Sequence, residues 1–205
     1  MCDKIVLTFN CIHEENTLSF NKQKYVKDAD NHHMFVSVNS VTTIDDWIFH
    51  KCTSLTTIII PDSITTIGYS AFAGCISLTH IVLPESVTTI TDWAFHNCTS
   101  LTNIIIPDKC TTIGLGAFAG CTSLTNIVIP NGVTTINKST FSHCQSLTNI
   151  IIPASVTTIG NIAFNNCESL TTVETDDENA YIINYCKRNY PNIDVVVSLG
   201  PYVLK

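Results

Sequence analysis

Residues 84–107 read PESVTTITDWAFHNCTSLTNIIIP, and the chain repeats this pattern without an insertion. Three residue types mark the 23-residue interval in six copies. They are Phe49, Phe72, Phe95, Phe118, Phe141 and Phe164, then Cys52, Cys75, Cys98, Cys121, Cys144 and Cys167, and then Leu55, Leu78, Leu101, Leu124, Leu147 and Leu170. A unit of this length is too short to bury a core alone, so each copy must stack on its neighbours. The sequence therefore predicts a repeat solenoid.

Each copy contains two segments with strand propensity. The Leu-Thr-x-Ile-x-Ile segment is rich in β-branched residues and ends at a proline, which cannot donate to a sheet. Val-Thr-Thr-Ile is a second, shorter β-prone segment. Between them, Ala-Phe-x-x-Cys lacks strand alternation and predicts a helical or 3₁₀ turn that places the phenylalanine in the core. The predicted fold class is a mainly β repeat solenoid whose coils each hold two short strands and one such turn.

The ends of a solenoid need atypical segments that cover the exposed core. We expect residues 41–173 to form the six repeats. Residues 1–40 are the predicted N-terminal cap, in which 34–38 is in phase with the coil strand and suggests a degenerate first coil. Residues 174–205 are the predicted C-terminal cap, with a short helix over residues 179–189 and a closing strand over residues 194–197. The apolar residues of the helix share one face, and Pro191 ends it.

The repeated residues also resemble a known family. Leu101–Ile106 fits the Leu-x-x-Leu-x-Leu core of leucine-rich repeats, and Pro84–Cys98 closely resembles the BspA-type (Treponema-type) leucine-rich repeat. The resemblance covers residues 41–173 and implies a leucine-rich-repeat-like fold. That family includes bacterial and protozoan surface proteins implicated in adhesion to host molecules. The resemblance therefore implies a protein-binding, adhesion-type role.

Composition excludes several classes of function. With a net charge of −7 and only 10 basic residues, the chain is a poor candidate for nucleic-acid binding, which needs Lys and Arg to neutralise phosphates. No apolar run approaches the length of about 20 residues that a membrane helix requires. Residues 1–20 lack the pattern of a signal peptide, which favours a cytoplasmic location, although related proteins are often at the cell surface.

No combination of residues predicts catalysis or a cofactor. Cys110 occupies a slot that holds valine in four other copies, so we interpret the cysteines as small buried hydrophobes with free thiols. No Cys-x-x-Cys pair suggests zinc, and the histidines are not clustered at ligand spacing. A serine recurs in every coil, and a residue that recurs in every coil serves the coil. The sequence therefore predicts a protein that is not an enzyme and holds no metal.

The outward side of the longer strand is the candidate binding surface. Because the first, fourth and sixth positions of the segment face the core, the second, third and fifth must face solvent. The fifth position forms an aligned apolar stripe, namely Ile59, Val82, Ile105, Val128 and Ile151. Beside it the third position holds His80, Asn103, Asn126 and Asn149, and the second holds a column of threonines. Exposed apolar stripes mark interaction sites more often than isolated apolar residues do; the alternative is that short β-branched side chains simply favour a strand.

We therefore expect a non-catalytic scaffold that presents this face to a protein or glycan partner. The alternative is a structural or self-associating protein with no separate ligand, joined through the same stripe or through strand edges at the caps. Ice binding by the paired threonines is disfavoured, because adjacent threonines alternate in direction. Copies also alternate in pairs: Asp46–His50 recurs two coils later as Asp92–His96, which indicates either two matched binding spots or a block duplication.

Overall fold

The computed structural model describes residues 41–175 and 180–197, together with the backbone of four short strands nearer the N-terminus. Those four are β1 (Lys4–Leu7), β2 (Ser19–Phe20), β3 (Gln23–Lys24) and β4 (Met34–Ser37). The longer coil strands are β7 (His80–Val82), β9 (Asn103–Ile105), β11 (Asn126–Val128), β13 (Asn149–Ile151) and β15 (Thr172–Thr175). The shorter ones are β5 (Thr43–Ile44), β6 (Thr66–Ile67), β8 (Thr89–Ile90), β10 (Thr112–Ile113), β12 (Thr135–Ile136) and β14 (Thr158–Ile159). Helix α1 (Ala180–Asn189) and β16 (Asp194–Val197) end the described chain.

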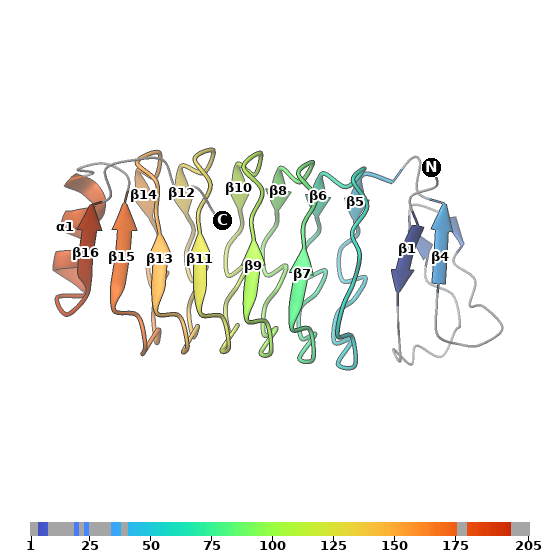
Figure 1. The fold of residues 1–205 in the computed structure, drawn as a ribbon, viewed down its shortest axis with the longest axis horizontal. Helices are drawn as coiled ribbons and strands as arrows, with labels where there is room; N and C mark the ends of the chain where they lie inside the picture. The colour runs from blue at the N-terminus through green and yellow to red at the C-terminus, as the bar shows by residue number, and fades with distance from the viewer. Residues whose placement is uncertain are drawn as a thin grey trace.

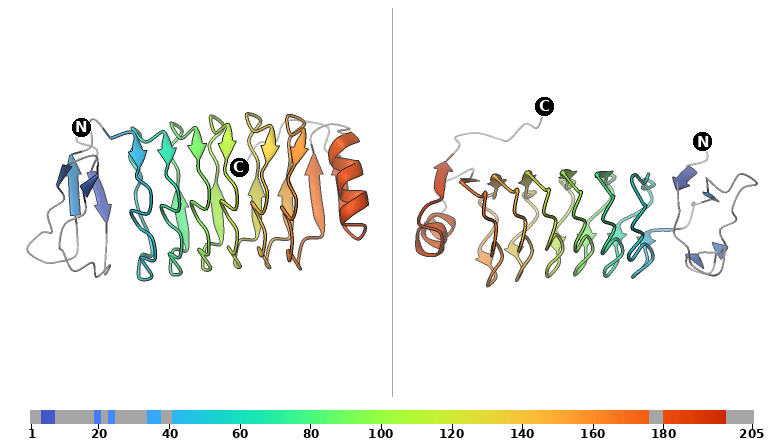
Figure 2. Two further views of the ribbon diagram at one scale, coloured as in Figure 1. Left: turned by 180° about the vertical axis from the view of Figure 1, so that it is seen from behind. Right: turned by 90° about the horizontal axis from the view of Figure 1, so that it is seen from below.

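The coils stack into the predicted solenoid, with the longer strands on one side and the shorter strands behind them (Figures 1 and 2). Pairing is parallel and keeps like positions together. Asn126 pairs with Asn149, and Thr66 pairs with Thr89. Each partner is therefore the residue one repeat away, so identical side chains form columns along the stack. None of the helices in the described part of the chain has the length and hydropathy needed to cross a membrane.

The turn between the two strands differs from the predicted helical or 3₁₀ turn. It is a run of β-turns closed by bonds such as Ala73 N–H to Ser70 C=O and Cys75 N–H to Phe72 C=O, at 3.1 Å each. Two positions in every coil, two residues before and two residues after the phenylalanine, have positive φ. A left-handed residue interrupts a right-handed helix, so no helix propagates here. Glycine occupies only Gly74, Gly116 and Gly120 among these positions, so residue type does not mark the other nine in the sequence.

The phenylalanines form one continuous column through the core. Consecutive rings are nearly parallel, and their centroids are 5.1 Å apart at Phe49–Phe72 and 5.8 Å apart at Phe141–Phe164. Tyr190 then packs edge-on against Phe164 at 6.1 Å and ends the column. Each interior ring is fully buried and contacts two identical neighbours, so the column couples every coil to the next.

The cysteines form a second column, and their thiols make hydrogen bonds as well as filling space in the core. Cys121 Sγ donates to the carbonyl of Phe95 at 3.2 Å, and the equivalent bond recurs at Cys75, Cys98, Cys144 and Cys167. These five thiols are free, as expected. The prediction was wrong for Cys52, which is disulfide-bonded. Cys52 belongs to the first of the six repeats, so no copy of the repeated phenylalanine lies 23 residues before Phe49 in the sequence.

The two-coil alternation is explained by packing between neighbouring coils. Asp92 Oδ1 accepts a hydrogen bond from Leu115 N–H at 2.7 Å, and Asp46 accepts the equivalent bond from the next coil. Glycines of the second coil lie against these aspartates: a Cβ on Gly114 would lie 2.5 Å from Asp92 Oδ1, and one on Gly68 would lie 2.7 Å from Asp46 Oδ1. The aspartate of one coil and the glycine of the next therefore recur together in both 46-residue pairs.

The C-terminal segment packs on the last coil. β16 pairs in parallel with β15, and α1 lies beside the shorter strands (Figure 1). The Tyr181 hydroxyl accepts a hydrogen bond from Ile159 N–H at 2.8 Å, so it replaces a carbonyl of a missing seventh coil. At the other end, β4 pairs antiparallel with β1, whereas a degenerate first coil would pair in parallel. That segment lacks the Ala-Phe-x-x-Cys turn that returns the chain to a parallel stack.

Candidate functional site

The outward side of β7, β9, β11 and β13, with residues 57–59, is called the strand face here. Its apolar stripe is exposed as the alternation implied: Ile59 is 59%, Val82 70% and Ile105 56% exposed. Val128 and Ile151 are half-buried. The intervening Ile104 and Ile127 point into the core. The structure therefore brings the predicted residues onto one surface, and their role in binding stays a prediction.

The polar column beside the stripe is not uniform. Asn103, Asn126 and His80 are exposed, and His80 Nδ1 lies 3.1 Å from the Thr79 hydroxyl. Asn149 is half-buried, because its Nδ2 donates to Glu174 Oε1 at 2.8 Å. The side-chain amide of Asn149 is therefore hydrogen-bonded to β15. The column is available to a partner at β7, β9 and β11 more than at β13.

The threonine column is used by the fold itself. Thr102, Thr125 and Thr148 each donate a hydroxyl to the carbonyl of the threonine one coil earlier, at 3.1–3.3 Å. On the shorter-strand side, Thr65 and Thr88 donate in the same way. These hydroxyls fix the register between coils. Because each of these hydroxyls already donates its hydrogen to a backbone carbonyl, only its lone pairs remain for a hydrogen bond with a ligand.

A groove of about 440 Å³ crosses the strand face between β9 and β11. The two strands lie in separate hydrogen-bonded sheets, and so do β10 and β12, which continue the same chain turns. A seam therefore separates residues 103–113 from residues 126–136 on the two strand-bearing sides, whereas the turns stay joined by bonds such as Phe118 N–H to Thr140 C=O at 2.9 Å. One backbone bond, Thr125 N–H to Thr102 C=O at 3.2 Å, still crosses it.

The sequence departs from the repeat along this seam. Ser86 and Ser155 each donate a hydroxyl to a carbonyl of the previous coil, at 2.6 and 2.8 Å. Gly132 occupies the same slot at the seam and has no hydroxyl to donate to the carbonyl of Cys110. A different glycine, one residue after the shorter strand, donates its backbone N–H to an isoleucine carbonyl of the previous coil in other repeats. At the seam that position is Asn137, and its side-chain Nδ2 donates to Ile113 O at 2.7 Å instead. Lys109 also lacks a serine hydroxyl in this slot, yet β10 and β8 remain paired there, so the slot alone does not mark the seam and sequence reasoning missed this groove.

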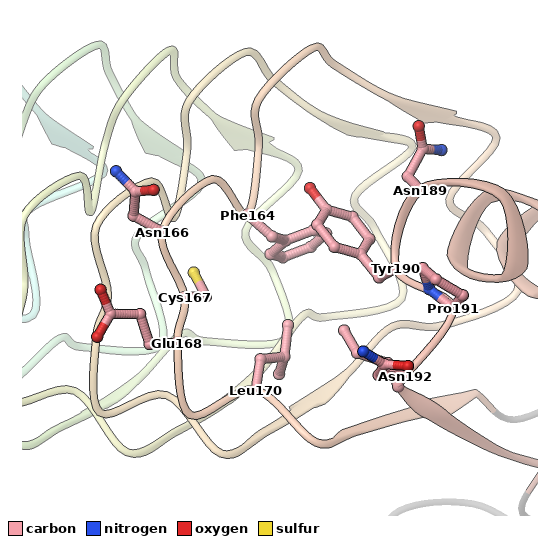
Figure 3. A pocket seen from close by; sticks show the side chains of 10 residues that line it. Phe164, Asn166, Cys167, Glu168, Leu170, Asn189, Tyr190, Pro191 and Asn192 are labelled. Carbon is pink, nitrogen blue, oxygen red and sulfur yellow. The ribbon is translucent and has the colours of Figure 1, made fainter.

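A second cavity, of about 380 Å³, lies where the last coil meets the cap (Figure 3). Phe164, Leu170 and Cys167 line its inner side, and asparagines and Glu168 lie nearer its edge. Burial raises the pKa of the Cys167 thiol to about 11, so it is protonated and weakly nucleophilic at neutral pH. With a single carboxyl group among its lining residues, the cavity offers no acid–base pair.

The remaining titratable groups are shaped by burial. Burial raises the pKa of the Cys75 thiol to about 12 and that of Cys98 and Cys121 well above the usual range. Burial lowers the pKa of His96, whose Nδ1 lies 3.0 Å from the Ala119 carbonyl. Across residues 41–175 and 180–197, no three His, Cys, Asp or Glu side chains gather as metal ligands. The strand face is therefore the best candidate surface.

Comparison with known proteins agrees with this architecture. A family model described as the BspA type leucine rich repeat region matches residues 22–145 and 111–198, with six copies. A leucine rich cell surface protein from Faecalibacterium prausnitzii is 28% identical with a TM-score of 0.63, over 91% of this chain and 44% of that chain. A search of curated proteins found no match.

Two further solved structures support the fold alone. The T. pallidum leucine rich repeat protein is 24% identical with a TM-score of 0.52, over 77% of this chain and 81% of that chain. The pneumococcal vaccine antigen PcpA is 23% identical with a TM-score of 0.59, over 76% of this chain and 38% of that chain. The chain thus spans less than half the length of the F. prausnitzii and pneumococcal proteins. Since the family model matches most of its residues, the chain belongs to the BspA type leucine rich repeat family.

Proposed function

We propose that this protein is a non-catalytic scaffold that binds another protein through its strand face. The observation that carries the proposal is the aligned exposure of Ile59, Val82 and Ile105 on one flat surface. A soluble protein seldom leaves such a row of β-branched apolar side chains uncovered without a partner. The similarity to a bacterial cell surface protein supports an adhesion-type partner.

The chemistry of the described residues supports binding over catalysis. Burial keeps the free cysteines protonated, and the threonine hydroxyls are engaged with backbone carbonyls. Repeat columns supply rows of identical side chains, whereas a general acid and a general base need different environments. Leucine-rich repeat proteins of this family are typically non-catalytic.

The test replaces two members of the stripe with lysine. Ile105→Lys with Val128→Lys should abolish capture of partner proteins from a lysate of the source cells, because two charges would be desolvated in the interface. The matched control, Ile76→Lys with Ile162→Lys, places the same charges on turns away from the strand face, at side chains 45% and 49% exposed. Both variants should keep the circular dichroism spectrum of the wild type. Identical partners captured by all three proteins would show that this face is not the site.

A second candidate is self-association through the end of the strand sheet. β16 is the last strand of its sheet, and Val196 on it is 45% exposed. An edge strand of β-branched residues favours pairing with another strand. Sedimentation at several concentrations tests this: a dimer that Val196→Lys dissociates supports self-association, and a monomer at all concentrations excludes it.

A further inference from the structure

The groove between β9 and β11 has two walls of similar composition, and Asp108 lines one of them. Ile105 and Val128 face each other across it, and Asn103 and Asn126 stand beside them, because like residues lie one coil apart. Its volume of about 440 Å³ lies within the range of about 300–1,000 Å³ that is usual for ligand sites. Elsewhere on the strand face, hydrogen-bonded neighbouring strands close this space. The groove is therefore a point where an apolar side chain of a partner can enter between coils.

A row of carboxylates lies along one edge of the same coils. Asp62, Glu85 and Asp108 each follow the proline that ends a strand, and all three are exposed. Asp108 lines the groove together with Ile105. The adjacent Lys109 is exposed and is not among the lining residues. The corresponding residues of the next two coils are Asn131 and Ala154, so the row is confined to the first three coils.

The most exposed apolar residues and the carboxylates lie on the same three coils. The three most exposed members of the stripe belong to the three coils that carry the carboxylates, whereas Val128 and Ile151 are half-buried. The surface that ends at the groove is thus apolar along its centre and negative along its edge. Charge complementarity across an interface steers association and rejects partners of like sign. A cationic partner with apolar side chains fits this surface, and an anionic one does not.

We propose that the groove binds an extended cationic peptide segment, with one leucine-sized side chain between Ile105 and Val128 and a lysine or arginine against Asp108. The proposal rests on the proposed function, since it uses the same face and adds the chemistry of the partner. The carboxamides of Asn103 and Asn126 each donate and accept, which suits the peptide groups of the segment. Asn126 Nδ2 donates one hydrogen to the Thr125 hydroxyl at 3.1 Å, and its side-chain carbonyl oxygen can accept a hydrogen bond from the segment.

The probe is a fluorescein-labelled nine-residue peptide that carries one leucine between two lysines in a glycine–serine background. Two matched peptides replace the lysines with glutamates, or the leucine with serine. Binding is followed by fluorescence anisotropy at 50 and 500 mM NaCl. We expect Val128→Lys to weaken binding of the Lys–Leu–Lys peptide at least tenfold. Asp108→Asn should weaken it two- to fivefold at 50 mM NaCl and less at 500 mM, because salt screens the pair.

The control variant Ile76→Lys adds the same charge away from the groove and should bind as the wild type does. The serine peptide should bind at least tenfold more weakly, and the glutamate peptide should not bind. Equal binding of the two charged peptides, or unchanged binding by Val128→Lys, would overturn the proposal. If the Lys–Leu–Lys peptide fails to bind while the Ile105→Lys/Val128→Lys variant still loses its lysate partners, the groove proposal alone is wrong. If the peptide binds at the groove and the lysate partners are unchanged, the groove proposal stands and the wider function fails.

Discussion

Replacing Cys121 separates two interpretations of the cysteine column. If the thiol is a small hydrophobe, alanine should be a better substitute than serine, because burying a hydroxyl without a partner costs about 1–3 kcal/mol. If the thiol is a hydrogen-bond donor, as its 3.2 Å contact with the Phe95 carbonyl indicates, serine should be the better substitute. The carbonyl also accepts from Cys98 N–H at 3.2 Å, so removing the thiol does not leave it unpaired.

The magnitude follows from these contacts. Cys121→Ala loses one hydrogen bond, worth about 1 kcal/mol, and leaves a small void that costs about 1 kcal/mol more. Cys121→Ser keeps a donor and should cost about 1 kcal/mol less than alanine does. With a urea m-value of about 2 kcal/mol/M, the unfolding midpoint should fall by roughly 1 M for alanine and roughly 0.5 M for serine.

Urea unfolding followed by circular dichroism, under one redox condition for all variants, measures these midpoints. Cys110→Val is the control, because other coils hold valine in that slot, and its midpoint should lie within about 0.3 M of the wild type. An alanine variant at position 121 that is more stable than the serine variant would refute the hydrogen-bond interpretation.

Phe118→Ala should lower the free energy of unfolding by about 4 kcal/mol, measured in urea, because a buried ring stacked on both faces is lost. Ile162→Asn should raise it by about 1 kcal/mol, since a β-branched residue is strained at φ 53° and asparagine tolerates that region; an unchanged midpoint would contradict this. Gly116→Ala should lower the thermal midpoint, because its Cβ would overlap Trp93 at 2.3 Å. Burial lowers the pKa of His96, so the unfolded chain binds more protons and stability should fall as pH drops below about 6.5; His96→Gln should flatten that slope in urea titrations between pH 7.5 and 5.

The repeat period was sufficient to predict the stack, the strands and the outward stripe. A strict 23-residue interval forces like residues into columns, and strand alternation then decides which of them face solvent. The exposure of Val82 and the burial of Ile81 follow from this reasoning without any coordinates. The helix at Ala180–Asn189 was also predictable, from its apolar spacing and the proline after it.

The turn conformation, the polar role of the cysteines and the groove were decided by the tertiary structure. Nine of the twelve left-handed turn positions lack glycine, so local preference does not mark them; they are held by bonds from one coil to the next, such as Phe95 N–H to Ala117 C=O at 2.8 Å. The Cys121 thiol gains its acceptor only when Phe95 of the preceding coil lies beneath it. Sequence by itself determined which residues repeat and therefore which ones align. How closely two coils approach depends on contacts between residues 22–26 apart, and at the seam a side-chain bond from Asn137 to the Ile113 carbonyl stands where other coils have a backbone bond.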